Sequence, residues 1–187
     1  VATGMSQQTR DHLGAVIEQL LFRELFDFQL MQTDPNPANY LYDGARNALV
    51  LLDFGATQVF EAGMVRGYKD IARAIVEDDL TAIERAALNL GYIAAGDAAE
   101  QKRAVVGLIR LICEPLRHPG PYDFGESDLP SRAWTQGFDL AFEQGLIRSP
   151  PPKTMFLHRK LVGSFLLCAR LGARVDVRAS ILPFLSP

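Results

Sequence analysis

Residues 32–57 read QTDPNPANYLYDGARNALVLLDFGAT and combine a loop that contains two prolines with a short hairpin. Pro35 and Pro37 keep the start of this stretch out of a helix, because proline lacks a backbone N–H and its ring clashes with the preceding turn. Residues 40–42 and 48–52 flank an Asp-Gly turn and predict two antiparallel strands. A loop therefore leads into a hairpin, and the tripeptide Asp-Phe-Gly follows the second strand.

Three polar residues of this stretch have a characteristic spacing. Asn39 lies five residues after Asp34, and Asp53 lies fourteen residues after Asn39. Protein kinases place a catalytic aspartate, an asparagine and the aspartate of DFG at closely similar intervals. Each residue alone is more typical of an ordinary turn, but the combination predicts a kinase-like site. In that interpretation Asp34 is catalytic and orients the nucleophile, while Asn39 and Asp53 bind Mg²⁺ and, through it, ATP.

Two other motifs resemble kinase signatures but lack their context. The second Asp-Phe-Gly begins at Asp123 and follows the sequence PGPY instead of a predicted strand. We expect this stretch to be a loop in which Asp123 forms a cap or a turn and Phe124 packs against the fold. The sequence LHRK at 157–160 lies inside a helical pattern, and Lys160 stands where a catalytic loop needs aspartate. Neither motif predicts a second catalytic site.

The remainder of the chain is predicted to be helical. Apolar residues recur at helical spacing in several segments, one of which Asp79 is expected to cap. The predicted helices are residues 7–28, a helix from 61 onward, a helix after 79, 97–116, 131–145, 153–171 and 177–184. No linker or repeat divides residues 1–187, so the sequence predicts one domain, mainly α with a small β-hairpin.

Composition excludes several classes of partner. The chain has 187 residues, 48% of them hydrophobic, and a formal net charge of −3. This balance gives no indication of nucleic-acid binding, and no apolar stretch is long enough to predict a transmembrane segment. The two cysteines lie in apolar helical segments and are expected to be free thiols. The histidines have no spacing that would indicate a zinc site.

Four segments together resemble the UbiB/AarF family of atypical kinases, in its coenzyme Q branch. They are FRELFDFQLMQTDPNPANYLYD, LVLLDFGATQVF, YDFGES and PPPKTMFLHRKLVGSFLLCARL. The resemblance implies a protein-kinase-like fold and ATPase activity with Mg²⁺ and ATP. It also implies association with ubiquinone-biosynthesis proteins at a membrane surface. The implied location is the bacterial cytoplasm or the matrix side of the mitochondrial inner membrane, to which the protein would bind peripherally.

The upstream half of a kinase site is not recognisable in the sequence. The first lysine is Lys69, and the alanine-rich nucleotide loop and the K-x-G-Q segment of the family do not occur. We therefore expect the chain to be a C-lobe from which the N-lobe is absent, and to be inactive in isolation. Thr33 replaces the arginine that often precedes the catalytic aspartate, which weakens the case for protein phosphorylation.

Two alternative functions stay open at this level. A non-catalytic, pseudokinase-type binding module would use its apolar helical faces to dock partner proteins or the membrane surface, although such faces more often form a core. A small-molecule kinase of the aminoglycoside type shares the D-x-x-x-x-N spacing, but the segment FLHRK…FLLC favours the UbiB/AarF resemblance. The phosphoryl acceptor and the oligomeric state are not determined by the sequence.

Overall fold

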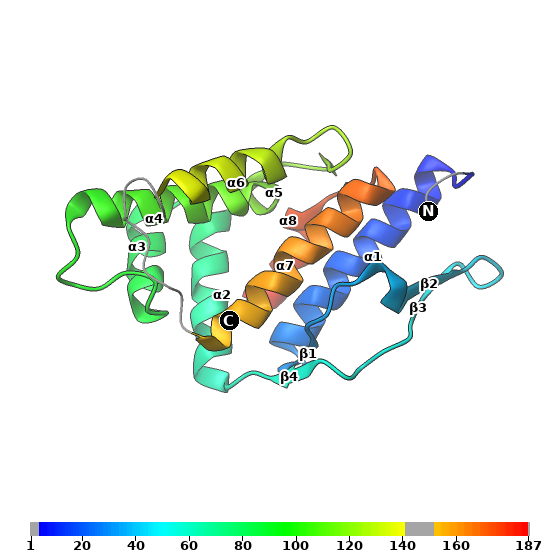
Figure 1. Ribbon diagram of the computed structural model, residues 1–187, viewed down its shortest axis with the longest axis horizontal. Coiled ribbons are helices and arrows are strands. Elements are labelled where there is room, and N and C mark those ends of the chain that lie inside the picture. The colour runs from blue at the N-terminus through cyan, green and yellow to red at the C-terminus, as the bar shows by residue number, and fades with distance from the viewer. Residues whose placement is uncertain (1–3, 141–151, 187) are drawn as a thin grey trace.

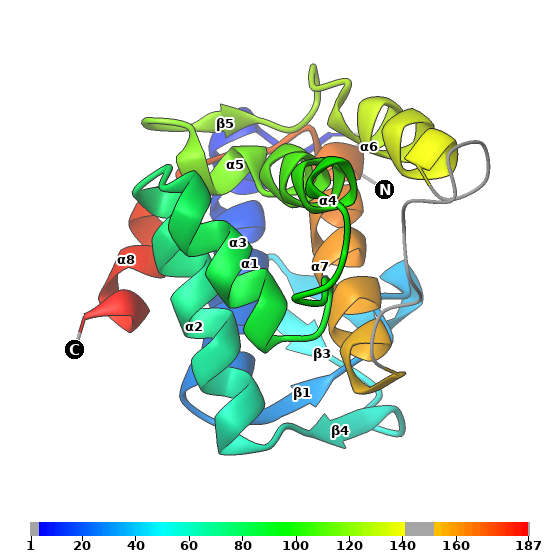
Figure 2. The ribbon, with the colours of Figure 1, turned by 90° about the vertical axis from the view of Figure 1, so that its left-hand side faces the viewer.

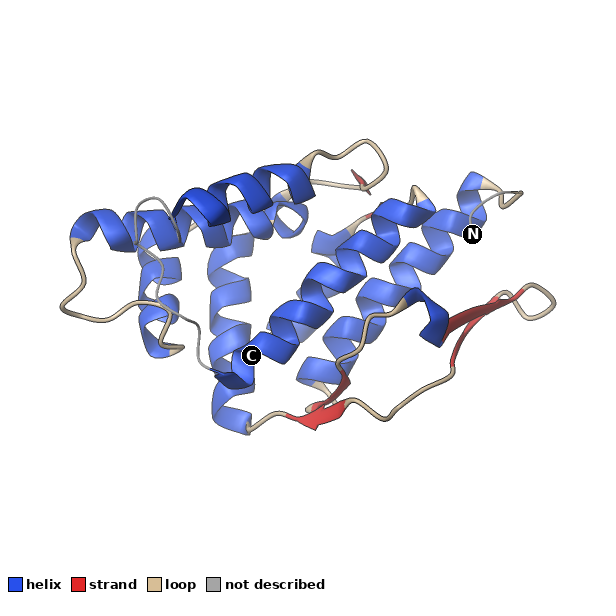
Figure 3. Cartoon of the chain, in the orientation of Figure 1, coloured by secondary structure: helices blue, strands red, loops and turns tan. Residues whose placement is uncertain are grey.

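The computed structural model describes residues 4–140 and 152–186, and most of these residues are helical (Figure 3). The helices are α1 (Gln7–Phe26), α2 (Ala62–Val76), α3 (Leu80–Asn89), α4 (Ala99–Ile112), α5 (Glu114–Arg117), α6 (Leu129–Phe138), α7 (Pro152–Leu171) and α8 (Val177–Leu185), with a short 3₁₀ helix η1 (Pro37–Asn39). The strands are β1 (Leu30–Gln32), β2 (Tyr40–Asp43), β3 (Ala48–Leu51), β4 (Thr57–Val59), β5 (Tyr122–Asp123) and β6 (Arg174–Val175). The mainly α class with a small hairpin is confirmed.

Helices α1 and α7 lie side by side and form the centre of the fold (Figure 1). The predicted apolar stripe of α1 faces inward, and Leu13, Ile17, Leu21 and Leu25 are all buried. Helices α2 and α8 pack against α1 as well, so one main hydrophobic cluster joins the first helix to the last. Helix α3 packs against α2, α4 against α3, and α6 against α4 (Figure 2). The core therefore depends on contacts between distant parts of the chain.

Local sequence signals set some of the helix boundaries. The side chain of Asp79 accepts a hydrogen bond from the backbone N–H of Ala82, which confirms its predicted role as the cap of α3. The helix predicted over 97–116 is interrupted instead, since α4 ends at Ile112 and α5 begins at Glu114. Pro115 accounts for the break, because it has no N–H to continue the helical ladder. The final part of the predicted helix 131–145 lies outside the described residues.

Over the described residues, three antiparallel strand pairs accompany the helices, and only the β2–β3 hairpin among them was predicted. In that hairpin Tyr40 pairs with Leu51 and Asp43 with Ala48. Strand β1 pairs with β4, and β5 pairs with β6. These strands have two or three residues each, too few to show an alternating pattern in the sequence.

The second Asp-Phe-Gly behaves largely as expected. Asp123 accepts hydrogen bonds from the backbone N–H groups of Gly125 and Glu126 and so forms a turn. Phe124 is buried against Phe165 in the main core. The prediction of a loop was wrong for Tyr122 and Asp123, which form strand β5.

Candidate nucleotide and metal site

The pairing of β1 with β4 brings the two halves of the predicted site together. Directly after β1, both the backbone N–H and the hydroxyl of Thr33 donate to the carbonyl of Ala56, at 3.0 and 2.7 Å. Thr33 precedes Asp34, and Ala56 follows the first Asp-Phe-Gly. Two segments more than twenty residues apart are thereby held next to each other.

A second backbone contact positions Asn39. The side chain of Asn36 accepts a hydrogen bond from the N–H of Ala38 and caps η1, which Pro37 begins. At the other end of η1, the carbonyl of Asn39 accepts a hydrogen bond from the N–H of Leu52 at 3.0 Å. Leu52 is the residue before Asp53, so the chain places Asn39 and Asp53 in adjacent parts of the structure.

Asp34 and Asn39 are in direct contact. The amide nitrogen Nδ2 of Asn39 donates to Asp34 Oδ2 at 3.0 Å and to the carbonyl of Asp34 at 3.3 Å. This arrangement uses the NH₂ group of Asn39. Within the described residues, no protein donor contacts Asn39 Oδ1. That oxygen is therefore available to coordinate a cation.

Asp53 is exposed and keeps one carboxylate oxygen free of protein donors within the described residues. Its Oδ1 accepts a hydrogen bond from the N–H of Gly55 at 2.7 Å, which fixes the orientation of the side chain. Strand β3 ends at Leu51, so Asp53 follows the strand by two residues. Within the described parts of the chain, Asp53 makes no hydrogen bond to Asp34 or Asn39.

The donor set fits Mg²⁺. This ion prefers oxygen ligands and commonly takes only one or two from the protein, with the rest from phosphates and water. Asn39 Oδ1 and the carboxylate of Asp53 are oxygens of the required kind. Over residues 4–140 and 152–186, no group of three His, Cys, Asp or Glu side chains forms an alternative metal site.

Helix α7 contacts the Asp34 loop through the sequence that was set aside as a false catalytic motif. Arg159 Nη2 lies 2.5 Å from Asp34 Oδ1. The next residue, Lys160, is buried and lies 3.3 Å from Glu24 Oε2, with further hydrogen bonds to Gln32 and the hydroxyl of Tyr40. Charged residues within an otherwise apolar helical stripe were the only signal in the sequence for this contact.

A buried network of polar side chains therefore holds the loop that carries Asp34. Glu24 Oε1 accepts from the backbone N–H of Gln32, and Gln32 Nε2 donates to the carbonyl of Asp34 at 2.9 Å. Burial raises the pKa of Glu24, while the nearby Lys160 opposes that shift. The loop that holds Asp34 is thus attached to both α1 and α7.

Comparison with known sequences shows which proteins the chain resembles. The profile of the ABC1 atypical kinase-like domain matches residues 2–87, which include Asp34, Asn39 and Asp53. The chain is 35% identical over 175 residues to the rat protein named atypical kinase COQ8B, mitochondrial, a match that covers 94% of this chain. The chain is similar to ABC1 atypical kinase-like proteins. The UbiB/AarF resemblance is confirmed by these matches.

A second relative carries a similar name. It is 34% identical over 172 residues to the mitochondrial atypical kinase COQ8 of Saccharomyces cerevisiae and covers 34% of that protein. It covers 33% of the rat relative. The chain therefore spans about a third of the length of these curated relatives.

A solved structure supports the kinase-like fold of the chain. The complex of Rv3197 with erythromycin from Mycobacterium tuberculosis superposes with a TM-score of 0.74. The superposition covers 98% of this chain and 46% of the other, at 19% sequence identity. Within the described residues, no helix is both long and apolar enough to cross a membrane.

Proposed function

We propose that this chain is the C-lobe of an atypical kinase-like protein that binds Mg²⁺ with ATP. The intact protein would act as an ATPase or phosphotransferase that supports ubiquinone biosynthesis. One observation carries the proposal: Asn39 is hydrogen-bonded to the side chain of Asp34 and, through its carbonyl, to the residue before Asp53. The arrangement matches the catalytic aspartate, asparagine and DFG aspartate of kinases.

Each residue has a distinct role in this proposal. Asn39 and Asp53 would hold Mg²⁺, which neutralises the charge of the phosphates when bound. Asp34 would orient the attacking hydroxyl or water. Its two carboxylate oxygens are held by Asn39 and Arg159, so the group would face the nucleophile in one orientation.

The biological setting follows from the relatives. Their names describe mitochondrial atypical kinases. For this chain we infer the same setting, on the matrix side of the inner membrane or, in a bacterium, in the cytoplasm. Ubiquinone-biosynthesis proteins and the membrane surface would be the partners of the intact protein.

Binding of Mn²⁺ tests the site directly, because Mn²⁺ accepts the same oxygen ligands as Mg²⁺ and is observed by electron paramagnetic resonance. We expect the chain to bind Mn²⁺ in the presence of ATP. Asp53→Ala, which removes a ligand, should weaken binding by roughly tenfold or more. Asp123→Ala, in the second Asp-Phe-Gly, is the matched control and should leave binding unchanged. Equal Mn²⁺ affinities in the two variants would overturn the proposal.

A further inference from the structure

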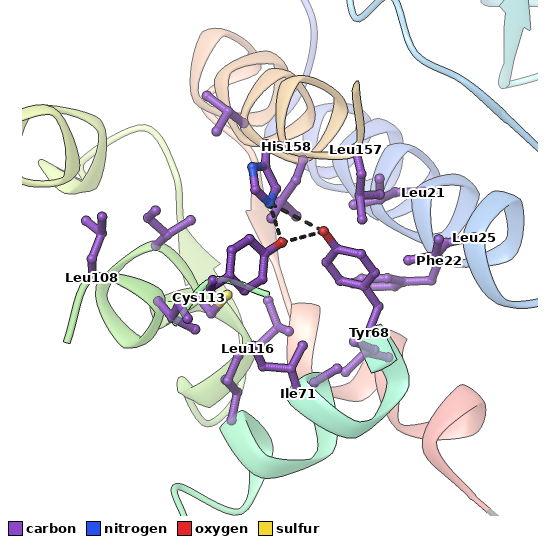
Figure 4. A pocket seen from close by; sticks show the side chains of 18 of the residues that line it. Leu21, Phe22, Leu25, Tyr68, Ile71, Leu108, Cys113, Leu116, Leu157 and His158 are labelled. Carbon is purple, nitrogen blue, oxygen red and sulfur yellow. Dashed lines mark hydrogen bonds between the residues drawn. The ribbon is translucent and has the colours of Figure 1, made fainter. Parts of the chain in front are cut away.

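A cavity of about 310 Å³ lies away from the Asp34 loop, between α1, α2, α4, α5, α7 and α8. Its walls are almost wholly aliphatic and aromatic, and include Leu21 and Leu25 from α1, Ile71 from α2, Leu108 from α4 and Leu157 from α7 (Figure 4). The volume is about twice that of an engineered cavity that binds benzene, and falls at the lower end of natural ligand sites. The space suits a molecule of on the order of a dozen non-hydrogen atoms.

One cluster of polar side chains interrupts this apolar lining. Tyr68 comes from α2, Tyr92 from the connection between α3 and α4, and His158 from α7. The two tyrosine hydroxyls are 2.5 Å apart, and the hydroxyl of Tyr92 is 2.6 Å from His158 Nε2. Figure 4 shows the polar ends of Tyr68 and His158 pointing toward each other within the pocket. Three separate elements therefore bring their polar atoms to one point.

The cluster is electrically neutral. Burial lowers the pKa of His158 and raises the pKa values of both Tyr68 and Tyr92, so each group favours its uncharged form. Among the described residues that line the cavity there is no Asp, Glu, Lys or Arg. A charged ligand would lose its hydration without gaining an opposite charge, which is strongly unfavourable.

The cluster can still form a hydrogen bond to a ligand. Each hydroxyl has one proton and two lone pairs, so acceptor positions stay unused even though Thr154 of α7 also hydrogen-bonds to both tyrosines. If His158 Nε2 carries the imidazole proton, His158 becomes a donor to the tyrosine hydroxyls and the hydrogen bonds between the three groups reverse their direction. A tyrosine proton then becomes available to an acceptor. The cluster can therefore form a hydrogen bond with either a hydroxyl group or a carbonyl oxygen of a ligand.

We propose that this cavity binds a neutral, mainly apolar molecule that carries one hydroxyl or carbonyl oxygen, with that oxygen held by Tyr68, Tyr92 and His158. The apolar body of the ligand would fill the space between α1, α4 and α7. The site is separate from the proposed Mg²⁺–ATP site, and none of Asp34, Asn39 and Asp53 lines the cavity.

Isothermal titration of the whole chain with octanol, octanone and octanoate tests this assignment at neutral pH. These probes share an alkyl body and differ in the polar end. We expect octanol and octanone to bind, and octanoate to bind at least about tenfold more weakly because its charge is not compensated. Failure of octanol and octanone to bind, or equal affinities for octanol and octanoate, would overturn the proposal.

Single hydroxyl deletions test the role of the cluster. Tyr92→Phe keeps the ring and should weaken octanol binding roughly fivefold, as expected for one lost hydrogen bond. Tyr122→Phe removes a hydroxyl that bonds to Glu114 and Ser127 outside the cavity, and should leave octanol binding unchanged. Equal octanol affinities in these two variants would show that the cluster does not hold the ligand and would overturn the assignment.

A pair of larger substitutions tests the location. Leu108→Trp should fill part of the cavity from α4 and abolish octanol binding, whereas Leu88→Trp adds the same ring on the exposed part of α3. Circular dichroism of each variant reports whether it is folded. Octanol binding that survives in a folded Leu108→Trp variant would place the ligand elsewhere and overturn the proposal. Asp53→Ala should bind octanol normally, which separates this site from the metal site.

Discussion

Arg159 Nη2 lies 2.5 Å from Asp34 Oδ1, so the last large helix of the chain contacts the loop that carries the proposed catalytic carboxylate. The two residues are 125 positions apart in sequence. On the same helix, Lys160 forms a buried ion pair with Glu24, and His158 enters the apolar cavity. Three consecutive residues of α7 thus lie in three different environments. We therefore expect substitutions at these positions to have different effects.

The two neighbouring ion pairs should differ strongly in their effect on stability. The side chains of Lys160 and Glu24 are 3% and 7% exposed, whereas that of Arg159 is 57% exposed. Lys160→Met leaves the Glu24 carboxylate buried without a positive charge beside it and should lower the free energy of unfolding by about 3–5 kcal/mol. Arg159→Ala removes a solvent-exposed pair and should cost less than about 1 kcal/mol.

Urea unfolding of the two variants measures this difference. The double variant Glu24→Gln/Lys160→Met removes both charges and should recover much of the stability lost in Lys160→Met alone. If Lys160→Met and Arg159→Ala cost the same, the buried pair does not have the role assigned to it.

Two glycines in helix interiors should respond in opposite ways to substitution by alanine. A Cβ at Gly163 on α7 would overlap the ring of Pro35, the residue after Asp34. Gly163→Ala should therefore displace the loop and lower the free energy of unfolding by about 1–3 kcal/mol. At Gly107 on α4 a Cβ would meet only Gln136 Nε2 at 3.7 Å. Gly107→Ala should stabilise the chain by about 0.5–1 kcal/mol, since alanine is the better helix former.

Thermal or urea unfolding of the two glycine variants provides the comparison. Mn²⁺ binding by Gly163→Ala adds a second readout, because the displaced loop also carries Asn39. An increase in stability for both variants would show that α7 and the Asp34 loop do not approach as closely as described.

Stability should fall as the pH rises because of Glu18. This residue is buried on α1, and burial raises its pKa from 4.5 to about 7 against the opposing effects of Ser164, Cys168 and Lys160. Below about pH 4.5 the carboxyl is protonated in both the folded and the unfolded chain and has no effect. Between about pH 4.5 and 7 only the unfolded chain releases the proton, so folding loses on the order of 3 kcal/mol across this range.

The variant Glu18→Gln isolates this contribution. It cannot titrate at position 18, so its stability should depend less on pH than that of the original chain between about pH 4.5 and 7. Glu24, whose pKa is also raised, stays present in both proteins and its effect cancels in the comparison. Identical pH dependence of urea unfolding in the two proteins would contradict the prediction.

Hydrolysis of ATP by the chain alone should be close to background. The chain spans about a third of its curated relatives. Phosphoryl transfer depends on groups that hold the nucleotide from both sides, and the proposed site supplies one side. Release of phosphate in the presence of Mg²⁺ is the measurement. Strong activity that Asp53→Ala abolishes would show that the chain already contains a complete site.

The sequence by itself determined most of the helices, although not the break between α4 and α5. It also determined the β2–β3 hairpin and the likeness of Asp34, Asn39 and Asp53 to a kinase site. These features depend on short-range signals: apolar periodicity, caps such as Asp79, and turn residues between strands. The spacing of the three polar residues could be recognised because it lies within one stretch of twenty residues, from 34 to 53.

Only the tertiary structure decided which residues contact the stretch from 34 to 53 and which side chains line the apolar cavity. The β1–β4 pairing, the contacts of Arg159 and Lys160, and the meeting of Tyr68, Tyr92 and His158 all join residues that are distant in sequence. Such contacts depend on how whole helices pack, and a one-residue rotation of α7 would exchange the surroundings of His158, Arg159 and Lys160. The local pattern of LHRK could not reveal these partners, because each residue faces a different part of the fold.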